Sequence, residues 1–256
     1  MTATWDPKQY AMYRDERSRP FLELLGRIPD RAFASIVDLG CGPGELTRSL
    51  AERWPAARVL GLDSSPDMLL SSAPHVMPGR LEFRLGDIAA FDEAQDLIFS
   101  NAALQWLGDH ETLIPRLAGL VRPGGCFAVQ MPANFYADSH ALLGETARDG
   151  SWAAKLAGGW QSPASREPAF YIEALWPLGF RVDAWETEYY FVLGGDDPVL
   201  EWVKGTALRP VLAVLEESER AAFTAAYAAR LRKAYPKTRQ GTIFPFKRLF
   251  FVAARE

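Results

Sequence analysis

The sequence is poor in cysteine and has no long hydrophobic run. Cys41 and Cys126 are its only cysteines, and neither has a partner at the spacing of a metal site or a redox motif. No apolar stretch approaches the roughly 18 residues that a membrane-spanning helix needs, and residues 1–19 are too polar for a signal peptide. We therefore expect free thiols, no bound metal, no membrane partner and a soluble, cytoplasmic protein.

The chain also lacks an excess of basic residues. Its 28 lysines and arginines are outnumbered by 32 aspartates and glutamates, so the formal net charge is -4 at pH 7. A general nucleic-acid binder needs a basic face to neutralise phosphates, so nucleic acid is not an expected partner. The hydrophobic fraction of 48% is that of an ordinary globular protein and excludes intrinsic disorder. The oligomeric state stays open.

Short apolar runs alternate with helical patterns over the first half of the chain. This alternation is typical of an α/β fold, in which a mostly parallel sheet carries helices on both faces. Strands are expected at 35–39, 58–62, 81–85, 96–100 and 126–131, and helices at 20–28, 46–54, 66–72 and up to residue 120.

The pattern changes after residue 131. Glycines and prolines between 144 and 168 predict a long irregular connection or flap. A helix at 170–178, a strand at 181–192, a helical cap at 196–236 and a last strand at 247–254 follow. We expect a single domain over 1–256, with a helical cover (1–30), a core that binds the cofactor (31–131), a connection with a helix (132–178) and the cap.

A glycine-rich loop follows the first expected strand, in the segment Val37-Asp38-Leu39-Gly40-Cys41-Gly42-Pro43-Gly44. Glycines at this place let the backbone turn tightly and approach a ligand closely. Asp63 ends the second strand about 20 residues later, where an acid accepts the hydroxyls of a ribose. Asp87 stands after the third strand, where it could accept from the amino group of an adenine. The pattern predicts a nucleotide-like ligand, although a tight strand-to-helix turn alone would also need these glycines.

The residues around this loop disfavour a phosphate. A dinucleotide site has a third glycine where this chain has Glu45, whose carboxylate would repel a pyrophosphate. No Gly-Lys-Ser/Thr follows, which excludes a Walker loop. S-adenosylmethionine has no phosphate and carries a sulfonium and an ammonium group, so Asp38 just before the loop favours it. We expect it as the cofactor, with S-adenosylhomocysteine as its product.

These motifs, together with Arg122-Pro123-Gly124-Gly125, resemble those of the class I S-adenosylmethionine-dependent methyltransferases. The resemblance implies a Rossmann-like, seven-stranded sheet with one antiparallel strand near the C-terminus. It also implies that the loop glycines approach the methionine part, Asp63 the ribose, and Asp87 with Ile88 the adenine. The full set of expected cofactor contacts is Arg19, Asp38, Gly40, Gly42, Asp63, Ser64, Asp87, Ile88 and Asn101.

A narrower resemblance spans nearly the whole chain. Segments outside the cofactor core, among them Trp5-Asp6-Pro7, Asn101 to Trp106, Arg166-Glu167-Pro168, Gly205 to Pro210 and Arg248-Leu249-Phe250, are similar to those of the trans-aconitate 2-methyltransferases. This resemblance implies esterification of one carboxylate of a small polycarboxylate. Such a nucleophile is already ionised at neutral pH, so no acid or base catalyst is expected. Gln105 and Trp106 are expected to position the acid, and Arg166, Arg209, Arg248, Tyr190 and His110 to bind it.

Each of these substrate residues has a structural alternative. Any one of the arginines could be a solvated surface charge, Tyr190 could be a core aromatic of its strand, and His110 is more typical of a helix surface. Two other functions also remain open at this point. The chain could methylate another small acid or malonyl-carrier protein, or it could bind S-adenosylmethionine without transferring the methyl group.

Overall fold

The computed structural model describes residues 14–157 and 165–256. These residues fall into two compact units. The sheet unit comprises residues 14–132, 165–187 and 248–256, and the helical unit comprises residues 133–157 and 188–247. Compactness does not show that either unit folds on its own, so the single domain expected from sequence stays a prediction.

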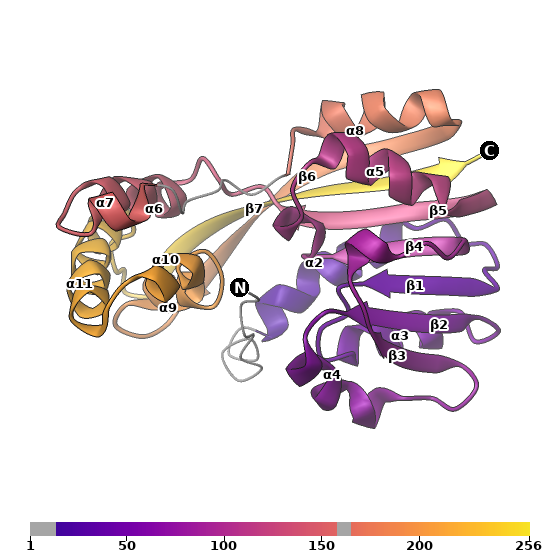
Figure 1. Cartoon of the computed structure of the whole chain (residues 1–256), viewed down its shortest axis with the longest axis horizontal. Helices are drawn as coiled ribbons and strands as arrows, with labels where there is room; N and C mark the ends of the chain where they lie inside the picture. The colour runs from indigo at the N-terminus through magenta and orange to yellow at the C-terminus, as the bar shows by residue number, and fades with distance from the viewer. Residues whose placement is uncertain (1–13, 158–164) are drawn as a thin grey trace. The chain divides into compact units, whose positions relative to one another are not determined.

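A seven-stranded sheet organises the fold, with the order β3-β2-β1-β4-β5-β7-β6 (Figure 1). The pairs β1/β2, β2/β3, β1/β4 and β4/β5 are parallel, and β5/β7 is antiparallel. The predicted mostly parallel sheet with an antiparallel strand near the C-terminus is therefore confirmed. The strands are β1 (Ser35–Leu39), β2 (Arg58–Asp63), β3 (Leu81–Leu85), β4 (Gln95–Asn101), β5 (Val121–Pro132), β6 (Phe180–Leu193) and β7 (Thr242–Arg255).

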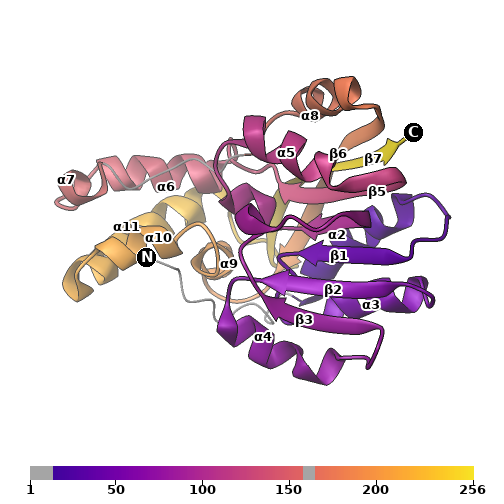
Figure 2. The ribbon, with the colours of Figure 1, turned by 45° about the vertical axis from the view of Figure 1, so that its right-hand side comes forward.

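Helices cover both faces of the sheet in the sheet unit (Figure 2). Phe99 of β4 meets Phe21 edge-to-face at 5.0 Å on one face, whereas Phe251 of β7 stacks on Tyr171 at 4.9 Å on the other. Buried aromatic contacts of this kind anchor a helix to a sheet. The helices of this unit are α2 (Arg14–Arg27), α3 (Glu45–Arg53), α4 (Pro66–Ser72), α5 (His110–Gly119) and α8 (Pro168–Leu175), with the 3-10 turns η1 (Ala73–His75), η2 (Ile88–Ala90), η3 (Leu104–Trp106) and η4 (Trp176–Leu178).

Local sequence signals explain several of these boundaries. Ser65 caps α4 by accepting from the backbone N–H of Met68, and Pro66 occupies the first helical turn. Gly179 ends η4 in a left-handed conformation with φ 82°, which glycine adopts without a steric penalty. The predicted start of the first helix at residue 20 was wrong, because α2 already begins at Arg14 and contains Pro20.

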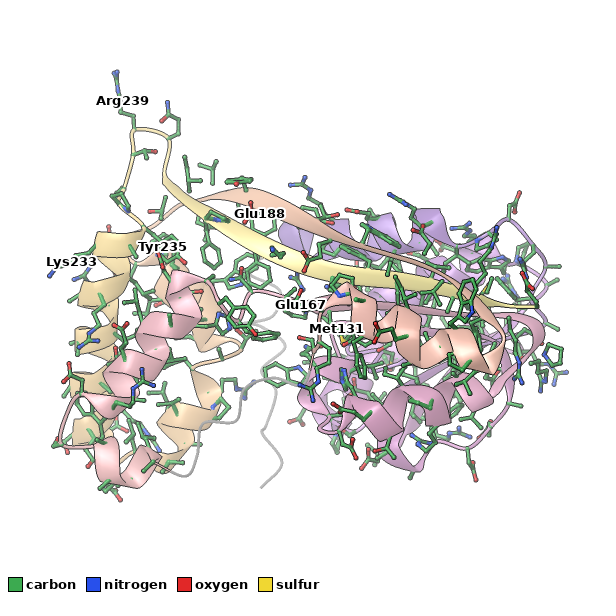
Figure 3. The ribbon with its side chains drawn as sticks, turned by 90° about the horizontal axis from the view of Figure 1, so that it is seen from above. Met131, Glu167, Glu188, Lys233, Tyr235 and Arg239 are labelled. Carbon is green, nitrogen blue, oxygen red and sulfur yellow. The ribbon has the colours of Figure 1, made fainter. Side chains whose placement is uncertain are left out.

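The helical unit has an aromatic core of its own. Trp202 stacks on Phe191 at 5.1 Å and also meets Phe244. Tyr235, labelled in Figure 3, accepts a hydrogen bond from the backbone N–H of Ser139 at 3.0 Å. Its helices are α6 (Asp138–Arg148), α7 (Ala153–Leu156), α9 (Pro198–Lys204), α10 (Arg209–Val214) and α11 (Glu217–Ala234).

The predicted irregular connection from residue 144 to 168 was wrong over much of its length. Gly144 lies inside α6, where it is buried beside Leu143, and α7 follows. Burial of the apolar face of α6 outweighs the low helix propensity of this glycine. Residues 158–164 of the predicted connection lie outside the described residues. Within the described ranges, no helix is long and apolar enough to cross a bilayer.

Candidate active site

The glycine loop joins β1 to α3 at the carboxyl edge of the sheet. The backbone N–H groups of Gly40 and Cys41 both donate to the carbonyl of Leu62, at 2.8 and 3.1 Å. A Cβ at Gly40 would lie 2.2 Å from the Cβ of Ala103, so internal packing requires a glycine there. At Gly42 a Cβ would meet no described atom within 4 Å. The open space above Gly42 is where a ligand could approach the backbone.

Asp63 ties this loop to the end of β2. Its Oδ2 accepts from the backbone N–H of Gly42 at 2.8 Å, and its Oδ1 accepts from that of Ser65 at 2.9 Å. Each carboxylate oxygen has a further lone pair with which to accept from a ligand hydroxyl. The cap of α4 is Ser65, which leaves Asp63 to the loop. Ser64 between them is exposed.

Asp38 is a buried carboxyl group in β1, with 3% of its surface exposed. Burial raises its pKa from 3.8 to about 7, the hydrogen bond from Thr47 partly offsets this rise, and the charge of Asp63 adds to it. The Thr47 hydroxyl donates to Oδ2 at 2.6 Å. A nearby cation would favour the ionised form of this group, so Asp38 is suited to a positively charged ligand.

The end of β3 contributes Asp87 and Ile88. Asp87 is exposed, and its Oδ1 caps η2 by accepting from the backbone N–H of Ala89 at 2.8 Å. Ile88 is buried, and its Cδ1 lies 3.8 Å from the position of a Cβ on Gly40. Ile88 therefore borders the glycine loop. Asp87 caps η2, and its expected contact with the adenine stays a prediction.

Carboxamides gather beyond the end of β4. Asn101 ends the strand, and its Oδ1 is buried without a hydrogen-bond partner among the described residues. Gln105 donates through Nε2 to the carbonyl of Ala102 at 2.8 Å, whereas its buried Oε1 has no partner in the part of the chain that the structure describes. Trp106 is 43% exposed. Unpartnered buried acceptors are rare in folded proteins, so each needs an explanation such as a catalytic role, an ordered water or an ion.

The three predicted substrate arginines differ in their surroundings. Arg248 is buried in β7 with 5% of its surface exposed, and it lies opposite Pro132 at the end of β5. Arg166 precedes α8, is exposed, and forms an ion pair with Glu111. Buried arginines are uncommon unless an anion or acceptor holds them, whereas exposed ion pairs contribute little. The solvated-surface alternative is therefore wrong for Arg248.

His110 is buried rather than placed on a helix surface, so the helix-surface alternative was wrong. Its Nε2 lies 3.0 Å from the carbonyl of Leu104 and its Nδ1 lies 2.9 Å from the hydroxyl of Tyr171. A carbonyl only accepts, so Nε2 donates and Nδ1 accepts from Tyr171. Burial is the main cause that lowers the pKa of His110. Both ring nitrogens are thus used inside the protein, which leaves no donor for a substrate.

The other expected side chains lie on separate elements. Tyr190 in the helical unit is 62% exposed and donates to Glu188 at 2.6 Å, so the core alternative was wrong. Arg209 begins α10 in the same unit and is half-buried. Arg19 lies on the exposed side of α2 in the sheet unit.

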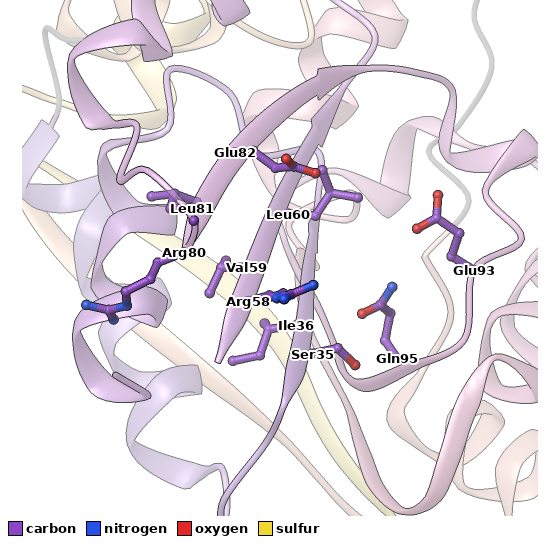
Figure 4. Close-up of a pocket in the computed structure, with 11 residues that line it drawn as sticks. Ser35, Ile36, Arg58, Val59, Leu60, Arg80, Leu81, Glu82, Glu93 and Gln95 are labelled. Carbon is purple, nitrogen blue, oxygen red and sulfur yellow. The ribbon is translucent and has the colours of Figure 1, made fainter. Parts of the chain in front are cut away.

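A separate cavity of about 360 Å³ lies at the opposite edge of the sheet (Figure 4). It is lined by residues at the amino ends of the first four strands, including Ser35, Arg58, Leu81 and Gln95. The glycine loop and the carboxamides lie at the carboxyl ends, where open α/β sheets bind their ligands. This cavity is therefore not the candidate active site. In the described part of the chain, no group of three His, Cys, Asp or Glu side chains could hold a metal.

Comparisons with known proteins show the family of this chain. Residues 36–125 match a family model described as a methyltransferase domain. The chain is 48% identical to a trans-aconitate 2-methyltransferase of Streptomyces avermitilis, over 99% of this chain and 97% of that one. The corresponding protein of Azoarcus sp. strain BH72 is 46% identical over 98% of this chain and 99% of its own length. The chain belongs to the trans-aconitate 2-methyltransferase family. This confirms the resemblance on which the sequence prediction depended.

The fold of this family member is also found in distant proteins. The solved structure of YcgJ from Bacillus subtilis superposes with a TM-score of 0.61, covering 93% of this chain and 98% of that one. At 12% sequence identity, this likeness concerns the fold alone.

Two buried side chains at the site of this trans-aconitate 2-methyltransferase family member were not predicted. Thr47 holds Asp38, and its place in the first turn after the glycine loop was a signal that could have found it. Gln130 lies in the apolar run of β5 with 0% exposure, and neither of its amide atoms has a partner among the described residues. A glutamine inside a buried strand was the available signal.

Proposed function

We propose that this chain transfers a methyl group from S-adenosylmethionine to one carboxylate of trans-aconitate, which gives a monomethyl ester and S-adenosylhomocysteine. One observation carries the proposal. A glycine loop flanked by carboxylates and a buried arginine, Arg248, belong to the same edge of one sheet. The first suits a cationic adenosyl donor and the second suits an anionic acceptor. The names of the full-length relatives support the choice of acid.

The residues present fit this cofactor. Gly42 leaves room for the methionine part, Asp63 has lone pairs for the ribose hydroxyls, and the buried Asp38 favours positive charge. The unpartnered Oδ1 of Asn101 could accept from an ammonium group. When bound, S-adenosylmethionine supplies an electrophilic methyl carbon on its sulfonium. Contacts from Arg19, Ser64, Asp87 and Ile88 remain part of the proposal.

The acceptor needs orientation rather than deprotonation. A carboxylate with a pKa of about 4 is ionised at neutral pH and is itself the nucleophile. His110 has both ring nitrogens occupied inside the protein, which agrees with a reaction that uses no general base. Arg248 would hold a carboxylate of the acid by two parallel hydrogen bonds. Arg166, Arg209 and Tyr190 remain further proposed contacts for the other carboxylates, whereas His110 is removed from that set.

Positioning of the two reactants supplies the acceleration of methyl transfer. Gln105 is fixed by its bond to Ala102, and Trp106 beside it offers a partly exposed aromatic wall. Together they would exclude water from the attacking oxygen and align it with the methyl carbon. Alignment of bound reactants can lower a barrier by roughly 7 kcal/mol or more.

A panel assay tests the proposal. Purified protein and labelled S-adenosylmethionine are combined with trans-aconitate, cis-aconitate, isocitrate, citrate and malonyl-carrier protein, and labelled ester is counted. We expect trans-aconitate to give the highest kcat/KM. A higher kcat/KM for another acceptor would replace the proposed acid, and the absence of ester from every acceptor would leave a protein that binds the cofactor without turnover.

A further inference from the structure

Gln130 stands out because a large polar side chain is completely enclosed without a hydrogen bond. Its exposure is 0%, and both Nε2 and Oε1 lack partners among the described residues. Most buried polar side-chain atoms in proteins are hydrogen-bonded, so each exception needs an explanation. A glutamine that only filled space would have been better replaced by leucine or methionine. The amide at this position therefore lowers the stability of the fold, which points to a role other than folding.

The strand register places Gln130 beside the other polar groups of the site. It lies opposite Asn101 of β4 on one side and opposite Phe250 of β7 on the other. Arg248 is two residues from Phe250 along β7, and residues two apart in a strand share a face. Asn101, Gln130 and Arg248 therefore lie on one face of the sheet, at the carboxyl edge of β4 and β5. On this face a neutral amide sits between a carboxamide and a buried guanidinium.

We propose that Gln130 recognises the acid acceptor, by donating from Nε2 to the carboxylate that Arg248 holds. Strand β4 separates Gln130 from β1 and its glycine loop, so Gln130 lies on the acceptor side of the site. An amide adds a donor without adding a charge, which avoids repulsion of a sulfonium nearby. The inference rests on the proposed function, because only an anionic acceptor gives Nε2 this partner.

This role has a signature that a structural role lacks. If a ligand carboxylate is the partner of Gln130, then methionine, which has nearly the same shape and no amide, removes two unpartnered groups from the free protein. The free protein would then be at least as stable, while binding of the acid would weaken. If Gln130 instead holds an internal water or supports the strands, the same change would lower stability and leave the acid unaffected.

The experiment compares wild type, Gln130→Met and Gln130→Glu in one kinetic series with trans-aconitate. Gln95→Met is the matched control, because Gln95 is also a buried glutamine of this sheet but lies at the amino end of β4. For Gln130→Met we expect KM to rise at least tenfold, the dissociation constant of S-adenosylmethionine to stay within twofold, and Tm to be unchanged or higher. Gln130→Glu places a carboxylate against the acid and should raise KM further.

The possible results separate this inference from the proposed function. An active wild type with a KM for Gln130→Met within twofold of its own would overturn the role of Gln130 alone. A lower Tm together with an unchanged KM would assign Gln130 to structure instead. If Gln130→Met fails to fold, Gln130→Glu with a KM below tenfold that of wild type would overturn the role as well. A wild type that esterifies no acid would overturn the proposed function, and the role of Gln130 with it.

Discussion

The two halves of the carboxyl edge of the sheet differ in how far their polar side chains are hydrogen-bonded. On the β1–β3 half, Asp63 already accepts from two backbone N–H groups and Asp38 from the hydroxyl of Thr47. On the β4–β7 half, both amide atoms of Gln130 and the Oε1 atom of Gln105 are buried without partners among the described residues. The first half is hydrogen-bonded before any ligand arrives, whereas the second keeps buried amide atoms that a ligand could bind.

This difference matches two tasks, the binding of the cofactor and the recognition of one particular acceptor. The cofactor half is held by its own hydrogen bonds, so it loses little conformational freedom when the cofactor binds. It can therefore serve any acceptor. Unpartnered buried groups on the acceptor half penalise every ligand that does not match them, and such groups discriminate more strongly than apolar walls. We infer that selectivity for the acid resides on the β4–β7 half.

The strongest test of this division is Arg248→Met. Truncating one member of a buried charged pair costs on the order of 2 to 5 kcal/mol, so we expect KM for trans-aconitate to rise by about 30-fold or more. Affinity for S-adenosylmethionine should stay within twofold, which calorimetry can measure. Arg48→Met is the control, because Arg48 is exposed and paired with Glu52 on α3. Equal losses of affinity for the acid and for the cofactor would contradict the division into a cofactor half and an acceptor half.

The reverse test is Asp63→Asn. Loss of a charged hydrogen bond acceptor should weaken the binding of S-adenosylmethionine by about 1 to 3 kcal/mol, while KM for the acid stays unchanged. Asp96→Asn is a close control, since Asp96 also accepts from two backbone N–H groups, those of Ala34 and Ser35, but at the amino edge. Both variants should lose stability. Cofactor affinity that is equal in the two variants would refute the ribose assignment.

The pKa of Asp38 gives a pH test of the cofactor half. If the ionised carboxylate favours the cation, cofactor affinity should rise between pH 6 and pH 8, as the group with its pKa of about 7 ionises. The rise should be about tenfold at most, because one proton is involved. Asp38→Asn should abolish this rise. An unchanged pH profile in Asp38→Asn would place the cation away from this carboxyl.

The stability of the free protein should change in the opposite direction. The pKa of Asp38 is higher in the folded chain than its ordinary value of 3.8. The neutral carboxyl therefore contributes stability that is fully present below about pH 4 and is lost as the pH rises through about 7. Thermal unfolding of wild type and Asp38→Asn at pH 5 and pH 8 measures this loss, and it should be smaller in the variant.

The smallest effect on turnover is expected at His110. His110→Leu leaves the Tyr171 hydroxyl and the Leu104 carbonyl without their partner, which should lower the free energy of unfolding by about 1 to 3 kcal/mol. The pH profile of kcat should not change, because no proton passes through the imidazole. A loss of the pH dependence of kcat in this variant would restore His110 to the reaction.

The two halves also differ in how far the sequence predicts them. Glycines and acids at fixed places after strands make the cofactor half readable, and Asp63 lies where its spacing from the loop predicts. Strands β1 to β4 were equally readable, because each combines a short apolar run with a following turn signal, whereas β5 and β7 each begin five residues before the predicted start. Gly144 misled the prediction of α6, since tertiary burial decided that helix rather than local propensity.

The acceptor half depends on register instead. Arg248 and Gln130 are distant in sequence and share a face only because β5 and β7 pair in one antiparallel register. Nothing in the amino-acid sequence indicates this strand pairing. Nor does it indicate that the Gln130 amide lacks hydrogen-bond partners among the described residues. The motif around Arg248 pointed to the arginine through resemblance, whereas Gln130 required the structure.

Cys41 gives the glycine loop a built-in chemical label. Its thiol is buried within the loop, and burial together with the charges of Asp38 and Asp63 raises its pKa. A thiol that is both enclosed and protonated reacts with alkylating reagents only during excursions that expose it. The alkylation rate of Cys41 therefore measures how often the loop opens, and slower labelling with bound donor would report closure without any engineered probe.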